Sequence, residues 1–159
     1  MDTAQNNQRS HFEKFERPVS EFTDKVMEIK RVSKKTKGGN QVSFTALVVS
    51  GDKKSRVGLG HARAKSVADA IAKAIKKAQK SLVSIPIVNG TISTAMTLKF
   101  KGAIIMLRPG KKGSGLIAGG PVRAVVELAG IQDIVSKIVG SRNKSVNVMA
   151  TFKALQSLS

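Results

Sequence analysis

Apolar residues recur at helical spacing between residues 66 and 82, with lysines between them. The apolar positions are Val67, Ala70, Ile71, Ala74, Ile75, Ala78 and Leu82, and the lysines are Lys73, Lys76, Lys77 and Lys80. Residues three or four apart share one face of a helix, so the segment has an apolar stripe and a positive face. Ser66 is suited to cap the first turn, with Asp69 in the position of a capping box. The pattern predicts an amphipathic helix packed on a sheet.

Three β-rich segments precede this helix, at residues 26–32, 42–49 and 56–60. The middle one alternates so that one face should be deeply buried and the other partly covered. Turn-forming residues at 37–40 and 51–54 separate the segments. The first half therefore predicts a β-β-β-α module, an antiparallel sheet with the helix across one face.

The strand over 56–60 ends in glycines and is followed by a basic turn with His61, Arg63 and Lys65. We expect this turn to bring Arg63 and Lys65 to the N-terminus of the helix. A helix N-terminus offers free backbone amides and a partial positive charge, so the turn predicts an anion site.

A proline and an Asn-Gly pair within residues 85–90 indicate a boundary between two modules. Beyond it, alternation over 96–101 predicts a strand, and the apolar run 103–107 predicts a buried strand. We divide the chain into a flexible N-terminal tail at 1–21, a first domain at 22–85, a linker at 86–90 and a second domain at 91–159.

Helix signals dominate the rest of the second domain. Pro121 suits the first turn of a helix, and Gly130 suits the left-handed position that ends it. We then expect a short helix over 133–139 and a last helix capped by Asn143 or Ser145. Strands and helices in this order predict an α+β fold.

The charge balance is strongly positive, with 28 Lys and Arg against 10 Asp and Glu and a formal net charge of +18. Hydrophobic residues make up 41% of the chain, which is enough for folded cores. Such an excess of one sign repels itself unless a polyanion neutralises it. Aromatic residues are only 4%, which disfavours stacking of single-stranded bases and favours recognition of duplex shape and phosphate.

The sequence argues against several other classes of protein. The chain has no Cys, which excludes disulfides and thiolate metal sites. No apolar run has transmembrane length, and the N-terminus has no apolar signal core, so we expect neither a membrane partner nor a secretion signal. His11 and His61 are the only histidines, and the acids show no metal spacing. We expect no catalytic residue, metal, cofactor or small-molecule substrate.

Glu127 and Asp133 each occur at a recognisable spacing from other residues. Glu127 lies four residues after Arg123, which predicts an ion pair along one helix. Gly113, Gly115 and Ala118 match a relaxed dinucleotide fingerprint, and Asp133 follows twenty residues after Gly113. A true fingerprint opens its helix within the motif, whereas here further Gly and Pro residues delay it. A nucleotide-dependent enzyme is therefore the weaker alternative.

Basic residues concentrate at predicted turns and hairpins, where they gain nothing locally and suit contacts with RNA phosphates. We expect a finger that reaches RNA, formed by Lys30, Arg31, Ser33, Lys34, Lys35, Lys37, Gly38 and Gly39. A second set of expected RNA contacts comprises Lys53, Lys54, Arg56, His61, Arg63 and Lys65, with Lys111 and Lys112 in the far domain.

Two sets of motifs resemble the family of bacterial small-subunit ribosomal protein five. The first half carries RVSK at 31–34, KGG at 37–39, SFTALVV at 43–49 and RVGLG at 56–60. The second half carries GSGLIAGGPVRAV at 113–125, ELAGI at 127–131 and GS at 140–141. The resemblance spans about residues 22–158, in order and at compatible spacing. The sequence departs from the family pattern at both ends: it stops at Ser159 where the family often carries a longer basic tail, and its Phe-bearing N-terminal extension is not part of the motifs.

The resemblance implies an N-terminal domain similar to the double-stranded RNA-binding fold. It also implies a C-terminal α+β domain with a left-handed β-α-β crossover. In the family, the protein lies on small-subunit ribosomal RNA (rRNA) near the decoding region and the channel for messenger RNA. The glycine-rich signature implies a protein interface at Gly113, Gly115 and Arg123, towards ribosomal protein four, which is associated with translational accuracy. Ribosomal protein eight is the other implied neighbour.

The sequence thus favours a structural, non-enzymatic RNA-binding protein of the small ribosomal subunit that supports assembly and accuracy. We expect it in the cytoplasm within the ribosome, with the plastid stroma as the alternative. A free-standing binder of duplex RNA or DNA is the first rival, and the nucleotide-dependent enzyme is the second.

Overall fold

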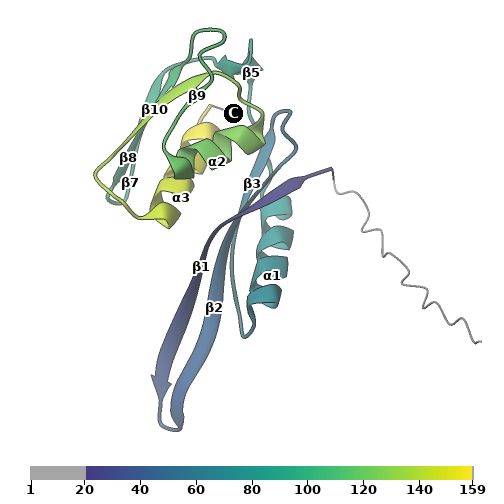
Figure 1. Cartoon of the computed structure of the whole chain (residues 1–159), viewed down its shortest axis with the longest axis vertical. Helices are drawn as coiled ribbons and strands as arrows, with labels where there is room; N and C mark the ends of the chain where they lie inside the picture. Colours follow the sequence, from purple (N-terminus) through teal and green to yellow (C-terminus); the bar gives the residue numbers. More distant parts are fainter. Residues whose placement is uncertain (1–20, 159) are drawn as a thin grey trace, which may run out of the picture.

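A computed structural model describes residues 21–158. It contains two four-stranded sheets, each packed against α-helices (Figure 1). The predicted tail lies outside the described residues apart from Glu21, and so does His11. The first sheet has the antiparallel order β1-β2-β3-β4. Its elements are β1 (Thr23–Thr36), β2 (Gly39–Gly51), β3 (Arg56–Ala64), α1 (Val67–Lys80) and β4 (Val83–Ser84). The predicted β-β-β-α arrangement is confirmed.

Helix α1 begins and packs as the apolar pattern predicts. Ser66 caps it, because its side-chain oxygen accepts a hydrogen bond from the backbone N–H of Asp69 at 3.1 Å. The residues buried against the sheet are Ala70, Ala74 and Ala78. Alanine on the helix meets glycine on β3, so the two backbones approach closely: a Cβ atom added at Gly60 would lie 1.9 Å from the carbonyl oxygen of Ala74.

Strand β3 is longer than the predicted segment and runs on to Ala64. His61 and Arg63 therefore lie on a strand, and only Lys65 lies in the turn before α1. The extension has a physical reason, since Phe44 to Leu47 of β2 offer pairing partners as far as Ala64. The expected basic turn is corrected to a single lysine.

The second sheet has the order β7-β8-β10-β9, and helices α2 and α3 pack on it (Figure 1). Strands β9 and β10 are parallel, and α2 connects them, so the predicted β-α-β unit is present. Its left-handedness stays a prediction. The elements are β7 (Met96–Phe100), β8 (Ala103–Pro109), β9 (Leu116–Ile117), α2 (Gly120–Ala129), β10 (Ile134–Val139) and α3 (Lys144–Gln156).

The prediction of a helix over 133–139 is wrong, because this segment forms β10. Its sequence, IVSKIV, is mostly β-branched, and such residues fit a pleated sheet better than a helix. It pairs with β8 on one side and β9 on the other. The two signals that flank helices are confirmed: Gly130 ends α2 with a φ of 88°, and the side chain of Asn143 caps α3.

The expected linker at 86–90 contains part of a small hairpin. Strands β5 (Ile87–Val88) and β6 (Thr91–Ile92) pair around Asn89 and Gly90, whose φ angles are 50° and 78°. Two successive positive φ values are what a tight hairpin turn of this kind requires. The domain limits themselves stay a prediction.

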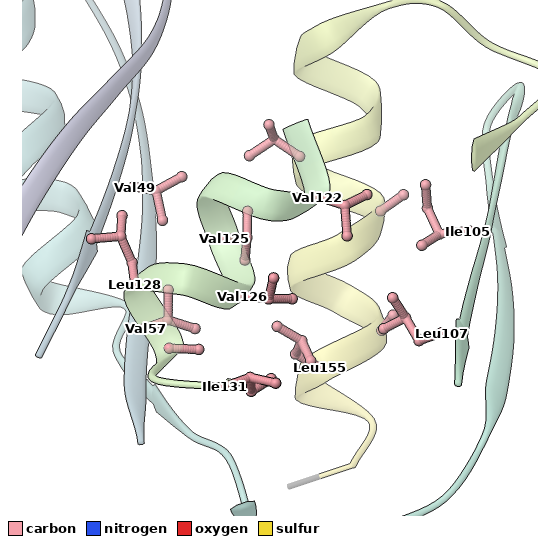
Figure 2. Close-up of a cluster of buried hydrophobic side chains, with 14 of the residues drawn as sticks. Val49, Val57, Ile105, Leu107, Val122, Val125, Val126, Leu128, Ile131 and Leu155 are labelled. Carbon is pink, nitrogen blue, oxygen red and sulfur yellow. The ribbon is translucent and has the colours of Figure 1, made fainter. Parts of the chain in front are cut away.

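The main hydrophobic core is shared by both halves of the chain. Figure 2 shows α2 between the strands of the first sheet, with Val49 and Val57, and the side chains of Ile105, Leu107 and Leu155. All five are essentially buried. Burial of apolar surface is the main favourable term in folding, so this core holds the two modules in one arrangement. In the described part of the chain, no helix has the length and apolarity to cross a bilayer.

Candidate nucleic-acid interface

The finger is the outer part of the β1–β2 hairpin, which extends past the end of β3 (Figure 1). The last pair between β2 and β3 is Phe44 with Ala64, whereas β1 and β2 stay paired to Thr36 and Gly39. The expected loop is therefore a two-stranded ribbon whose turn is only Lys37 and Gly38. All residues from 30 to 41 are exposed.

The finger carries positive charge on both faces. Side chains alternate along a strand, and paired residues project to the same side. Arg31 pairs with Phe44, which packs beside the residues that face α1, so Arg31 lies on the α1 side. Lys30 and Lys34 lie on the other side, with Thr45 and Gln41 as partners. An extended polyanion can thus contact the finger along either face.

A hollow of about 550 Å³ lies where the finger joins α1. Its lining includes the predicted residues Lys34, Arg63 and Lys65 and one further cation, Lys73. The Nε atom of Arg63 donates to Ser43 Oγ at 2.6 Å, which fixes the guanidinium in the hollow. Sequence reasoning placed Lys73 on the positive face of the helix but missed that this face continues into the finger.

The helix N-terminus contributes less to this hollow than expected. Ser66 already accepts the N–H of Asp69 through its side chain and that of Ala70 through its carbonyl. The Asp69 residue itself lines the hollow. The negative charge of Asp69 and the hydrogen bonds of Ser66 reduce the attraction of the α1 N-terminus for an anion. The four cations of the hollow therefore contribute most of that attraction. His61 lies outside the hollow, exposed on β3.

Lys53, Lys54 and Arg56 are not brought together with the finger, since they lie at the opposite end of the sheet in the β2–β3 turn. Asp52 holds this turn by accepting the backbone N–H groups of Lys54, Ser55 and Arg56. Arg56 also donates from Nε to Asp52 Oδ2 at 2.8 Å and lies over the ring of Phe22. Arg56 is therefore held by contacts within the chain.

The carboxyl group of Asp52 illustrates how strongly this turn is ordered. Burial opposes its ionisation, but the Arg56 side chain and three backbone amides outweigh burial and hold the pKa of Asp52 well below its usual range. A lowered pKa means that the charged form stabilises the fold at neutral pH. The second expected set of RNA contacts thus divides into a cluster at the finger and a separate, rigid turn.

The glycine-rich loop of the second module is closed by Asp133. Its carboxylate accepts the N–H of Gly113 at 3.1 Å and that of Gly115 at 2.7 Å. Both glycines have positive φ, which turns their amides towards one point. The spacing that resembled a dinucleotide fingerprint is thus an internal contact. Lys111 and Lys112 lie exposed on the rim of the same loop.

We predict that Asp133→Ala will loosen this loop without unfolding the chain. Two part-buried amides would lose their charged acceptor, which costs about 1–3 kcal/mol. Hydrogen exchange at Gly113 and Gly115 should become about tenfold faster or more. Asp52→Ala, which removes an equivalent acceptor from the β2–β3 turn, is the matched control and should leave exchange at both glycines unchanged. Unaltered exchange in Asp133→Ala would show that the aspartate does not hold the loop.

An apolar hollow adjoins the glycine loop on the outer face of the second sheet. Its volume is about 480 Å³, and Ile117 and Val135, which line it, are 54% and 37% exposed. Arg123 fixes the nearby strand by donating from Nη2 to the carbonyl oxygen of Leu116 at 3.0 Å. Exposed apolar side chains with a basic rim are typical of a protein contact. The predicted interface residues Gly113, Gly115 and Arg123 do not line this hollow, and only the contact of Arg123 with Leu116 brings one of them near its β9 side.

Several contacts between the modules were not predicted. Glu127 forms its ion pair with Lys25 of β1 at 3.1 Å, and not with Arg123 as expected. Glu28 of β1 accepts a hydrogen bond from Ser145 of α3 and forms an ion pair with Lys30 at 3.0 Å. Burial raises the pKa of Glu28, but Ser145 and Lys30 outweigh it and lower that pKa overall.

Among residues 21–158, no group of three or more His, Cys, Asp or Glu side chains is arranged to hold a metal ion. Asp52 and Asp133 hold turns and loops, and Glu28 and Glu127 form contacts between the modules or within β1. The candidate site itself is a surface of cations.

Comparison with known proteins assigns the family. The model of "Ribosomal protein S5, N-terminal domain" matches residues 22–86, and that of "Ribosomal protein S5, C-terminal domain" matches residues 98–159. Curated relatives are called small ribosomal subunit protein uS5. The relative from Mycoplasmopsis agalactiae is 52% identical over 140 residues, which cover 87% of this chain and 61% of the relative.

Two further relatives are similar over more of their own length. The protein of Treponema pallidum is 47% identical, with 87% of this chain and 80% of the relative covered. The protein of Protochlamydia amoebophila is 44% identical, with 98% and 92% covered. The chain thus spans about six tenths of the mycoplasmal relative and nearly all of the chlamydial one. By both family models and by these relatives, the chain belongs to the ribosomal protein S5 family.

Proposed function

We propose that the chain is a structural, non-enzymatic component of the small ribosomal subunit that binds its rRNA. The observation that carries this proposal is the finger, a ribbon of exposed cations on both faces that projects from a rigid two-module body. The names of its relatives, which are small-subunit proteins, support the same conclusion. The location that follows is the ribosome in a bacterial cytoplasm.

The mechanism is neutralisation of phosphate charge at fixed positions. Each contact between a lysine and a phosphate releases counterions, so affinity comes from many weak contacts and falls steeply with salt. Contacts with the phosphate backbone set the position of a protein on RNA without reading its sequence. A body held by one shared core can keep two RNA segments at a constant separation.

The finer assignments also belong to this proposal. The finger would contact rRNA near the decoding region and the messenger channel. The glycine-rich signature, with Gly113, Gly115 and Arg123, would meet ribosomal protein four and would influence translational accuracy. Ribosomal protein eight would be the other neighbour. The exposure of Ile117 and Val135 supports a protein partner at the second sheet.

The test is to replace Lys34, Lys35 and Lys37 together by Gln. If each makes one phosphate contact, affinity for small-subunit rRNA should fall about 10- to 30-fold at moderate salt. The slope of log affinity against log salt should become shallower by about two to three. Filter binding over a range of salt concentrations measures both quantities.

The matched control replaces three exposed lysines of the second module, Lys99, Lys101 and Lys153, by Gln. It has the same net charge and should lose much less affinity. Equal losses in the two triple variants would contradict a role for the finger. A free-standing duplex binder would wash off small subunits in high salt, whereas the proposed component should sediment with them.

A further inference from the structure

Glu28 lies where the finger leaves the rest of the molecule. It follows an irregularity in the pairing of β1 with β2, between Val26 and Glu28. Its carboxylate accepts a short hydrogen bond from Ser145 Oγ in the first turn of α3 and forms an ion pair with Lys30. One acid therefore joins the finger to a helix that is 117 residues away in the sequence.

Cations lie near Glu28 in the sheet, although its own partner on β2 is the buried Leu47. The register places Lys30, Thr45 and Arg63 in one row across the three strands, and the Arg63 guanidinium turns to Ser43 and the hollow beside α1. Neighbouring strands are about 4.8 Å apart, so the backbones of Lys30 and Arg63 are about 10 Å apart. Arg63 is held by Ser43, and Lys30 is held by Glu28. Both cations thus have fixed positions although they are exposed to water.

The first turn of α3 adds positive charge from the other module. Lys144 is near enough to act electrostatically on Glu28, and Arg142 is exposed just before the helix. The N-terminal end of α3 lies beside β1 in Figure 1, which agrees with the bond from Ser145. Lys30 and Lys144 therefore flank the same carboxylate from different elements.

We propose that the root of the finger and the first turn of α3 form one surface for the phosphate backbone of an RNA duplex, with Glu28 as the positioning residue that joins its two halves. This inference rests on the proposed function. A surface that bound RNA by charge alone would be better without a central carboxylate. By holding the cations of β1 and α3 at a fixed separation, Glu28 reduces the ordering cost when RNA binds.

Glu28→Gln distinguishes a surface that binds by charge alone from one that Glu28 positions, because the two predict opposite changes in RNA affinity. The substitution removes one negative charge, so a surface that acts by charge alone would bind RNA more tightly. The proposal instead expects about three- to tenfold weaker binding of the full chain to a duplex RNA of about 20 base pairs, because Gln cannot form the ion pair with Lys30. Fluorescence anisotropy at constant salt measures the difference. Unchanged or tighter binding would overturn the proposal.

Ser145→Ala tests the same link without a change in charge. It should weaken binding about two- to fivefold, and the double variant Glu28→Ala/Ser145→Ala should bind no more weakly than Glu28→Ala alone, because Glu28→Ala already removes the acceptor of the Ser145 hydrogen bond. Ser93→Ala, at an exposed serine in the loop before β7, is the control and should bind normally. Losses that simply add would contradict the shared contact. Melting curves of each variant verify that it is folded.

The outcomes distinguish this inference from the proposed function. If the triple variant of the finger lysines bound rRNA normally, the proposed function itself would fail. If that variant lost affinity while Glu28→Gln gained it, the finger would stand and only the joined surface would fall. Should Glu28→Gln leave RNA binding unchanged but abolish binding of a neighbouring ribosomal protein, the surface would serve a protein, and the RNA proposal would be overturned.

Discussion

Replacing Gly60 with Ala should destabilise the chain by about 3 kcal/mol, because overpacking here acts against backbone and not against a mobile side chain. The added Cβ would lie 1.9 Å from the carbonyl oxygen of Ala74 and 2.8 Å from the backbone nitrogen of Ala78. Neither atom can rotate away, so α1 must lift from the sheet. For a chain of this size, the melting temperature should fall by about 6–12 °C.

Gly38→Ala is the matched control, since a Cβ there would meet nothing within 4 Å. It should change the melting temperature by no more than about 2 °C, as expected for an exposed position. Thermal and urea unfolding followed by circular dichroism would measure both variants. Equal stability of Gly60→Ala and Gly38→Ala would mean that α1 is not packed as closely as the structure shows.

Local patterns predicted the helices that carry their own boundary signals. The limits of α1 follow from Ser66 and the apolar stripe, and the end of α2 follows from Gly130. Such signals act within one turn of the chain, so the sequence contains all that they need. The stripe did not reveal how close α1 comes to the sheet, because that depends on Gly60 of another element.

Strand β10 shows where local patterns fail. Apolar residues at Ile134, Val135, Ile138 and Val139 suit one side of a short helix as well as a strand, and Gly140 resembles a helix end. The choice is made by partners on both sides, β8 and β9, which are distant in sequence. The periodicity of a six-residue segment contains no information about its pairing with distant strands.

The position of a candidate cation can be predicted where charges are dense along the chain, but a contact between distant segments cannot. The finger lysines are neighbours in sequence, and the structure keeps them on one ribbon. Lys53 and Lys54 are also dense in charge, yet the direction of β2 carries them to the other end of the sheet. The partners of Glu28 and Glu127 are more than 100 residues away, so no local rule could name them.

The two modules also meet where α2 ends against the β2–β3 turn. The N–H of Lys53 donates to the carbonyl oxygen of Leu128 at 3.0 Å, so the two modules are joined backbone to backbone. A Cβ atom at Gly51 would lie 2.2 Å from that same oxygen. Glycine on both sides of the contact is what allows this approach. The largest effect on the joint between modules is therefore expected at Gly130.

Gly130→Ala should cost about 2–5 kcal/mol, because two penalties combine. The φ of 88° is a left-handed conformation that costs an L-residue about 1–2 kcal/mol. In addition, the new Cβ would lie 2.3 Å from the carbonyl oxygen of Lys53, a backbone clash worth about 1–3 kcal/mol. Relief requires the turn and α2 to separate, so the amide of Lys53 should exchange with solvent much faster.

Gly115→Ala isolates the first penalty, since Gly115 has a φ of 69° but a Cβ there would meet nothing within 4 Å. It should cost only about 1–2 kcal/mol, and the amide of Lys53 should stay protected. The difference between the two variants then measures the clash between modules. If Gly130→Ala were no less stable than Gly115→Ala, the β2–β3 turn could move to admit the new Cβ without loss of stability. The finger would then lack a rigid base, because the joint between modules would yield to a single methyl group.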